Sequence, residues 1–131
     1  MTVSPATTVF IVDDDEPVRD SLKVLLESYD LSVRDYASCG DFLKEVPAAD
    51  QGCLLLDMHM PVMDGLTFMQ RHGDRLRGLP VIMITGRADP VTRTRARAAG
   101  IVEFLEKPVD DDVLLDAIGR AVQGTVNSRP A

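Results

Sequence analysis

The chain has 131 residues, of which 45% are hydrophobic and 27% are charged, and its formal net charge is −7. This balance is typical of one globular domain; it excludes intrinsic disorder as the main state and argues against a nucleic-acid-binding surface over the whole domain. No apolar run is long enough for a membrane span, the N-terminus has no signal-peptide pattern, and Cys39 and Cys53 fit no metal or disulfide framework, so we expect a cytoplasmic protein with reduced cysteines.

Five short apolar runs predict the strands of a sheet. Four of them are continuous, which is typical of strands buried on both faces of a parallel sheet. They cover residues 9–12, 53–56, 81–84 and 101–105. A weaker run over residues 31–36 alternates imperfectly and predicts an edge strand.

Helical patterns separate these runs. Pro17 stands in the first turn of the first helix. The apolar face of that helix consists of Val18, Leu22, Leu25, Leu26 and Tyr29. A capping pattern at Ser38 predicts a second helix that reaches about Val46. A third helix, marked by Leu66, Met69 and Leu76, ends near Gly78.

The last two helices differ in composition. The fourth, over residues 90–99, is rich in arginine, and Gly100 suits its C-terminal cap. Acidic residues 110–112 favour the start of the fifth. Its buried face would consist of Leu114, Ala117, Ile118 and Ala121. Residues 124–131 are polar and unpatterned, so we interpret them as a tail or a truncated linker after a domain over residues 8–123.

Strand and helix thus alternate five times. Because crossovers between parallel strands are right-handed, this order predicts an α/β doubly wound five-stranded parallel sheet with helices on both faces. In such a sheet ligands bind beyond the carboxyl ends of the strands.

Chemically active side chains follow four of the predicted strands. They are Asp13, Asp14 and Asp15 after the first strand, Asp57 after the third, Thr85 after the fourth and Lys107 after the fifth. Crowded carboxylates repel one another, and a few oxygen ligands with positions left for water suit Mg²⁺. A carboxylate beside Mg²⁺ can attack a phosphoryl group, whose charge the metal, the hydroxyl and the amine would share.

Four motifs in this order resemble the receiver domain of bacterial two-component response regulators. They are Val12-Asp13-Asp14, Leu55-Leu56-Asp57-Met58-His59-Met60-Pro61, Ile84-Thr85-Gly86 and Phe104-Leu105-Glu106-Lys107-Pro108. Residues 14–19 and the loop after Asp57 are most similar to the FixJ-type transcriptional regulators. The resemblance implies a flavodoxin-like or CheY-like fold with strand order 2-1-3-4-5.

The resemblance also implies roles for the acidic residues. Asp57 would accept the phosphoryl group. Asp14 would bind Mg²⁺ directly, with Asp13, Asp57 and the backbone carbonyl of His59 as further ligands. Asp15 would stay outside this set as a helix cap. The residues alone also allow a solvated acidic cap at the first helix.

Three further residues receive roles from the resemblance. Thr85 would donate a hydrogen bond to the phosphoryl group, and Lys107 would pair with it. Phe104 would be an aromatic switch that rotates when Thr85 moves. The peptide bond between Lys107 and Pro108 is expected to be cis.

The implied function is a phosphorylation-controlled switch that receives its phosphoryl group from a sensor histidine kinase. It is not an enzyme beyond assisting its own phosphorylation and dephosphorylation, and a missing effector domain would control transcription. These residues suggest no direct contact with nucleic acid or membrane. Two alternatives are a phosphate-independent pseudo-receiver and a phosphohydrolase of the haloacid dehalogenase type. The latter needs an Asp two residues after its nucleophile, where this chain has His59.

Residues 87–97 contain four arginines and one aspartate, a local charge of +3. Pairing of this segment with acidic residues 110–112 or Asp116 of a second copy would favour a homodimer through the fourth helix, fifth strand and fifth helix. The alternative is a solvated arginine face.

Overall fold

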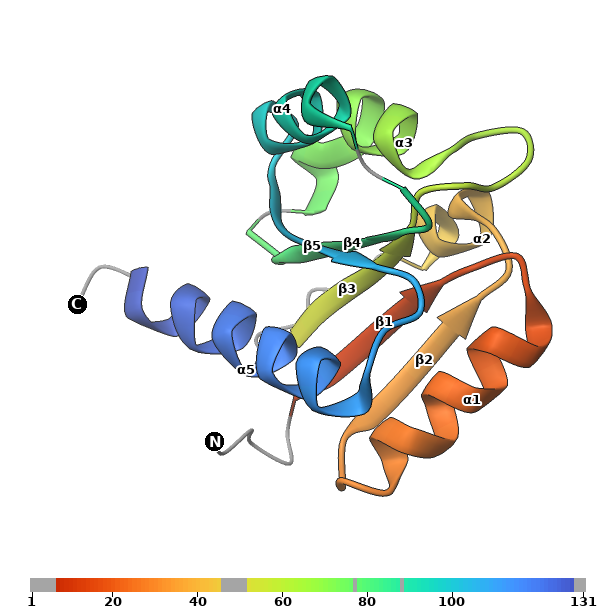
Figure 1. The fold of residues 1–131 in the computed structure, drawn as a ribbon, viewed down its shortest axis with the longest axis vertical. Coiled ribbons are helices and arrows are strands. Elements are labelled where there is room, and N and C mark those ends of the chain that lie inside the picture. Colours follow the sequence, from red (N-terminus) through yellow and green to blue (C-terminus); the bar gives the residue numbers. More distant parts are fainter. Residues whose placement is uncertain (1–6, 46–51, 77, 88, 129–131) are drawn as a thin grey trace.

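The structure, a computed structural model, describes residues 7–45, 52–76, 78–87 and 89–128, with side chains up to residue 123. Strands and α-helices alternate along these residues (Figure 1). Their bounds are β1 Thr8–Val12, α1 Glu16–Glu27, β2 Ser32–Tyr36, α2 Cys39–Lys44, β3 Gly52–Asp57, α3 Gly65–His72, the 3₁₀ turn η1 Gly73–Leu76, β4 Val81–Thr85, α4 Pro90–Ala98, β5 Ile101–Glu106 and α5 Asp111–Ser128. Within the described ranges, no helix is long and apolar enough to span a membrane.

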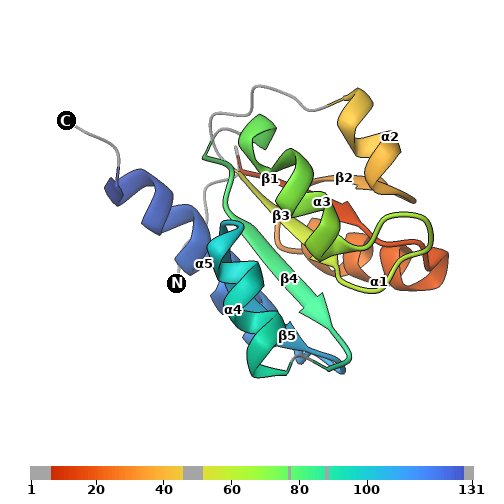
Figure 2. The same cartoon turned by 90° about the horizontal axis from the view of Figure 1, so that it is seen from above.

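All five strands are parallel, in the order β2-β1-β3-β4-β5. This confirms the predicted fold class and strand order. Helices α1 and α5 cover one face of the sheet, and α2, α3 and α4 cover the other (Figures 1 and 2). Because β1 is paired with both β2 and β3, the connections reverse direction there, and the crevice at the carboxyl ends of β1 and β3 is where such sheets bind ligands.

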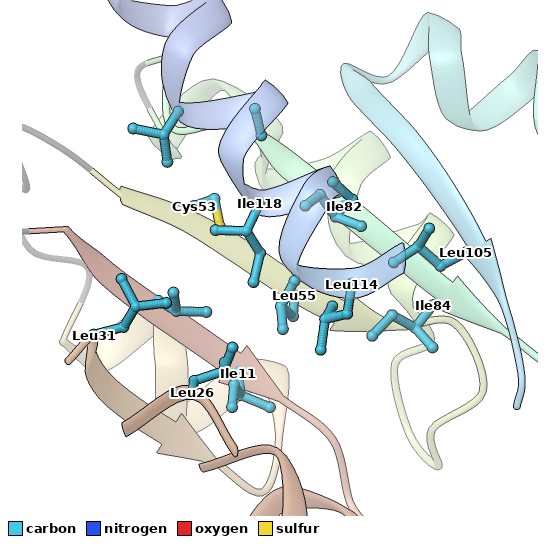
Figure 3. Packing of buried hydrophobic residues seen from close by; sticks show 14 residues of the cluster. Ile11, Leu26, Leu31, Cys53, Leu55, Ile82, Ile84, Leu105, Leu114 and Ile118 are labelled. Atoms are coloured by element: carbon cyan, nitrogen blue, oxygen red, sulfur yellow. The ribbon is translucent and has the colours of Figure 1, made fainter. Parts of the chain in front are cut away.

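The first apolar cluster joins the sheet to α1 and α5. Ile11, Leu55 and Ile82 project from neighbouring strands to this face, and Leu114 and Ile118 of α5 pack onto them (Figure 3). All five side chains are fully buried. The predicted apolar face of the fifth helix is therefore confirmed.

The second cluster, on the opposite face, is centred on the ring of Phe42 from α2. Its ring centroid lies 5.9 Å from that of Phe10, 5.3 Å from that of Tyr36 and 6.1 Å from that of Phe68. Tilted and edge-on ring pairs at these distances are favourable beyond their buried area. The central strands thus contribute apolar side chains to both faces, which is why their sequences are continuously apolar.

Both cysteines are free and buried, as expected. Burial raises the pKa of the Cys39 thiol to about 11 and that of the Cys53 thiol to about 12. Their thiols therefore stay protonated and pack as apolar groups.

The ends of α1 and α3 differ from the sequence prediction. α1 ends at Glu27, so Tyr29 lies beyond it and is exposed rather than on the apolar face. α3 ends at His72, and the expected continuation toward Gly78 is the separate 3₁₀ turn. The predicted end of the second helix near Val46 lies outside the described residues.

The fifth helix is longer than predicted, because its backbone stays helical through Ser128 instead of becoming a tail at Gly124. A helix anchored by buried residues such as Ala121 and Val122 can propagate through residues of low propensity, since each added residue forms one more hydrogen bond. The division into a domain over residues 8–123 and a linker after it stays a prediction.

The cluster around α5 should carry much of the stability. Replacing the buried Leu114 with Ala should lower the free energy of unfolding by about 2–5 kcal/mol, because the change removes apolar contacts and leaves a cavity. Val113→Ala on the same helix is the matched control, since Val113 is 46% exposed. Urea denaturation measures both variants, and equal losses would contradict the assigned core.

Candidate functional site

The carboxyl ends of β1 and β3 bring three carboxylates together. Because Val12 pairs with Leu56, the next residues, Asp13 and Asp57, lie side by side. One carboxylate oxygen from each of Asp13, Asp14 and Asp57 lies within 4.8 Å of the others. Asp13 and Asp57 are each only 4% exposed, whereas Asp14 faces solvent. Neighbouring strands thus place the predicted acidic residues in one cluster.

Asp15 plays a separate role, as expected. Its side chain accepts a hydrogen bond from the Val18 amide at 3.2 Å and caps α1. Its own amide donates to Asp13 Oδ1 at 2.9 Å. The cap therefore also fixes the direction of the Asp13 carboxylate.

The electrostatics of Asp13 show how unfavourable the cluster is. Burial raises the pKa of the Asp13 carboxyl above its usual value, and the charges of Asp57 and Asp14 raise it further. The hydrogen bond from Asp15 and the charge of Lys107 act in the opposite direction without reversing the shift. An all-oxygen, partly buried and mutually repelling donor set of this kind fits a hard divalent cation such as Mg²⁺.

Lys107 approaches the cluster from the end of β5. Its Nζ lies 3.3 Å from Asp57 Oδ1, and its amide donates to the Thr85 carbonyl at 2.8 Å. The Lys107–Pro108 peptide bond is cis, as expected. The His59 amide also lies 3.4 Å from Asp57 Oδ1. Asp57 is thus the carboxylate that contacts both the amine and the loop after β3.

That loop is fixed by Asp64 and Gly65. The Asp64 side chain accepts a hydrogen bond from the Thr67 amide at 2.8 Å and caps α3. The Gly65 amide donates to the Met58 carbonyl at 3.0 Å, and a Cβ on Gly65 would lie 2.8 Å from the Asp57 carbonyl oxygen. Only glycine permits this close approach. Asp64 and Gly65 together therefore hold the backbone of Asp57 in place.

Thr85 is buried at the end of β4, and its hydroxyl is engaged by its own loop. The hydroxyl donates to the Arg87 carbonyl at 2.9 Å and accepts from the Arg87 amide at 3.1 Å. His59 Nε2 lies 3.3 Å from the same oxygen, although the sequence indicated a role only for the backbone of His59. The pairing of Asp57 with Ile84 brings the loop after β3 next to the end of β4, where Thr85 lies.

Phe104 is half-buried on β5 beneath α4. The guanidinium carbon of Arg93 lies 5.3 Å from the centroid of the Phe104 ring, and that of Arg97 lies 5.9 Å from it. Arg93 Nη2 also contacts Glu106 Oε1 at 3.0 Å. In the sequence these arginines stand out only as part of a basic segment, because their place over the ring depends on how α4 packs on β5.

Comparison with known proteins identifies the family. The family model described as "Response regulator receiver domain" matches residues 9–119. The chain belongs to this family. It is 40% identical over 119 residues to the transcriptional regulatory protein FixJ of Rhizobium meliloti (strain 1021), and the match covers 91% of this chain and 58% of that protein. It is 42% identical over 111 residues to the C4-dicarboxylate transport transcriptional regulatory protein DctR of Rhodobacter capsulatus, covering 83% and 56%.

Solved structures agree with this assignment. The FixJ-N crystal structure has a TM-score of 0.81 at 38% identity and covers 95% of this chain and 97% of that one. A CheY-like receiver domain from Methanospirillum hungatei JF-1 has a TM-score of 0.86 at 27% identity, covering 94% and 98%. The resemblance to a FixJ-type receiver is thereby confirmed. The chain spans less than two thirds of the length of the curated relatives FixJ and DctR.

Receiver domains of this family act as phosphorylation-controlled switches in two-component signal transduction, so the predicted function is confirmed at this level. Receiver domains generally use Mg²⁺ at their acidic pocket and are phosphorylated by sensor histidine kinases. The match favours this function over the phosphohydrolase alternative.

The raised pKa of Asp13 predicts a pH-dependent effect of Asp13→Asn on stability. In the native protein the Asp13 carboxyl keeps its proton to a higher pH than in the unfolded chain. The wild type therefore loses stability as the pH rises from the unfolded-state pKa of Asp13 through its raised native-state pKa. In EDTA at pH 7, Asp13→Asn should therefore melt a few degrees higher, which corresponds to about 1 kcal/mol for a domain of this size. The gain should shrink as the pH falls toward 4, because the wild-type carboxyl is then increasingly protonated.

The amide oxygen that Asp13→Asn introduces can still accept the hydrogen bond from the Asp15 amide, so the variant removes the charge and keeps this contact. Asp20→Asn, on the exposed side of α1, is the charge-matched control. Calorimetry between pH 4 and pH 8 measures all three proteins. A destabilised Asp13→Asn at neutral pH would contradict the argument.

Proposed function

We propose that this receiver domain accepts a phosphoryl group on Asp57 from the phosphohistidine of a sensor histidine kinase, with Mg²⁺ bound beside it. The observation that supports this most strongly is the position of Asp57. Its carboxylate is buried at the end of β3, within the acidic cluster, and lies 3.3 Å from the Lys107 ammonium. Among the described residues, Asp57 is the carboxylate that belongs to the acidic cluster and also forms an ion pair with Lys107.

In the transfer, an oxygen of the Asp57 carboxylate attacks phosphorus while the bond from phosphorus to the kinase imidazole breaks. Asp13, Asp14 and Asp57, with the backbone carbonyl of His59, would hold the Mg²⁺. Bound there, Mg²⁺ supplies positive charge that offsets the carboxylate repulsion and the charge of the phosphoryl oxygens. The Lys107 ammonium pairs with a phosphoryl oxygen, replacing its contact with Asp57 Oδ1.

The output follows from Thr85 and Phe104. To donate to a phosphoryl oxygen, the Thr85 hydroxyl has to give up the Arg87 carbonyl to which it now donates. Its movement leaves space behind it, and the half-buried Phe104 rotates inward to fill that space. The free energies of the two conformations must differ by only a few kcal/mol for one phosphoryl group to shift their populations.

The wider setting rests on the relatives. FixJ, DctR and TdiR are transcriptional regulatory proteins nearly twice as long as the matched segment. We infer that this receiver acts in the cytoplasm and controls transcription through an effector domain linked beyond α5. We also infer that its own residues contact neither DNA nor membrane. The basic face of α4 would contact acidic residues 110–112 or Asp116 of a second copy.

Phosphorylation can be tested with a small phosphodonor. Incubation with acetyl phosphate and Mg²⁺ should add one phosphoryl group to the wild type, as measured by intact mass. Asp57→Asn should abolish the added mass, because the amide cannot form the acyl phosphate. EDTA should suppress it in the wild type, since the carboxylate cluster then lacks its counter-charge.

Asp20→Asn again serves as the control and should be labelled like the wild type. Asp14→Ala should remain folded yet lose Mg²⁺ affinity, which separates the metal site from the acceptor. Undiminished labelling of Asp57→Asn, with peptide mapping that shows no new site, would refute the assignment.

Self-association is tested by sedimentation velocity with and without beryllofluoride. We expect activation to strengthen association at low salt, and high salt to weaken it, because the contact would join opposite charges. Arg95→Glu on α4 should weaken it, whereas Arg71→Glu on α3 should not, since both arginines are exposed but only Arg95 lies on the basic helix. A monomer under every condition would rule out the homodimer.

A further inference from the structure

Two arginines of α4 lie over the ring of the half-buried Phe104. Their guanidinium carbons are 5.3 Å (Arg93) and 5.9 Å (Arg97) from the ring centroid, within the range of cation–π attraction. The two residues are one helical turn apart on α4, which lies beside β5 (Figure 2), and both reach the same ring on that strand. The ring is therefore held by two cations from the neighbouring helix.

Glu106 fixes one of these cations. Arg93 Nη2 lies 3.0 Å from Glu106 Oε1, with the Arg93 side chain 37% and the Glu106 side chain 55% exposed. On the β4–β5 ladder, Phe104 pairs with Met83 and Glu106 pairs with Thr85. The arginines, the ring and the carboxylate thus form one unit directly beside the strand end that carries Thr85.

We propose that Arg93 and Arg97 are positioning residues that hold Phe104 in its resting place and so oppose the activated conformation. The inference rests on the proposed function, in which Phe104 rotates inward when Thr85 engages a phosphoryl oxygen. Inward rotation takes the ring away from both guanidinium groups. The arginines therefore stabilise the resting state selectively. They increase the free energy that binding of a phosphoryl group must supply before the ring rotates.

General electrostatics predict the opposite effect. Positive charges on α4 attract an anion at the site, so neutralising them would weaken the binding of a phosphoryl analogue if charge alone mattered. Release of the ring would instead strengthen that binding, because less of its free energy would be spent on moving Phe104. The sign of the change therefore separates the two effects.

The test is the affinity for beryllofluoride at saturating Mg²⁺, followed by amide chemical shifts at protein concentrations where every variant is a monomer. The double variant Arg93→Gln/Arg97→Gln should bind about fivefold more tightly than the wild type, the change expected from losing two partly exposed cation–π contacts. Arg95→Gln is the matched control. It removes the same kind of charge from the exposed side of the same helix, but Arg95 takes no part in the two ring contacts.

Phe104→Leu shows whether the effect passes through the ring. In that background, the double arginine substitution should no longer tighten binding, because there is no ring to release. In the resting wild type, the side-chain protons of Arg93 and Arg97 should be shifted upfield by the ring, and Phe104→Leu should abolish this shift. If the arginines only stabilised α4, their substitution would not tighten beryllofluoride binding in a way that depends on Phe104.

Three results would overturn the inference. The double variant could bind beryllofluoride no more tightly than Arg95→Gln, or the tightening could persist in the Phe104→Leu background. In either case a wild type that still binds the analogue leaves the proposed function standing. A wild type that binds no beryllofluoride would instead overturn the proposed function and this inference together.

Discussion

The repulsion among the carboxylates of Asp13, Asp14 and Asp57 is the constraint on which the rest of the structure depends. One carboxylate oxygen from each of the three residues lies within 4.8 Å of the others, and Asp13 and Asp57 are buried. A flexible chain would not keep such an arrangement, because the charges would move apart. The sheet imposes it, because Asp13 and Asp57 end neighbouring strands whose register is set by apolar pairs such as Val12 and Leu56. The stability of the apolar clusters on both faces offsets this local unfavourable energy.

The need to hold these carboxylates together also explains why the site is built on the most deeply buried strands. A one-residue slip of β3 would exchange its two faces, moving Leu55 out of the α1 and α5 cluster and Leu56 out of the cluster around Phe42. Register is therefore strongly specified where Asp57 must be placed. The close approach of Gly65 to the Asp57 carbonyl adds a second restraint at the strand end. A cation arriving at the cluster meets ligands that are already held together.

The strands and the site cluster could be predicted from the sequence because both follow from burial and topology. Strands buried on both faces read as continuous apolar runs, and parallel connections bring their ends to one edge. Helix ends were less predictable: Tyr29 fits the helical spacing yet lies beyond the end of α1, and α5 continues past Gly124. The contact of His59 with Thr85 and the arginines over Phe104 depend on side-chain rotamers and on how a helix sits on a strand. No periodicity in the sequence indicates a side-chain rotamer or the way a helix packs on a strand.

Those unpredicted contacts share one property: each holds a group that the proposed switch has to move. The Thr85 hydroxyl gives up a neutral hydrogen bond, which contributes about 0.5–1.5 kcal/mol, and Phe104 gives up two cation–π contacts of about 0.5–1 kcal/mol each. Against this, a hydrogen bond from Thr85 to a charged phosphoryl group contributes about 1.5–3 kcal/mol, whereas Lys107 exchanges its contact with Asp57 for one with the phosphoryl group. The gain and the loss therefore differ by no more than a few kcal/mol. A margin of that size lets one phosphoryl group reverse the populations while the resting state stays dominant without it. Had the resting contacts been absent, the same chemistry would leave the unphosphorylated domain partly active, so the arginines over Phe104 bear on the fidelity of the signal as much as on its strength.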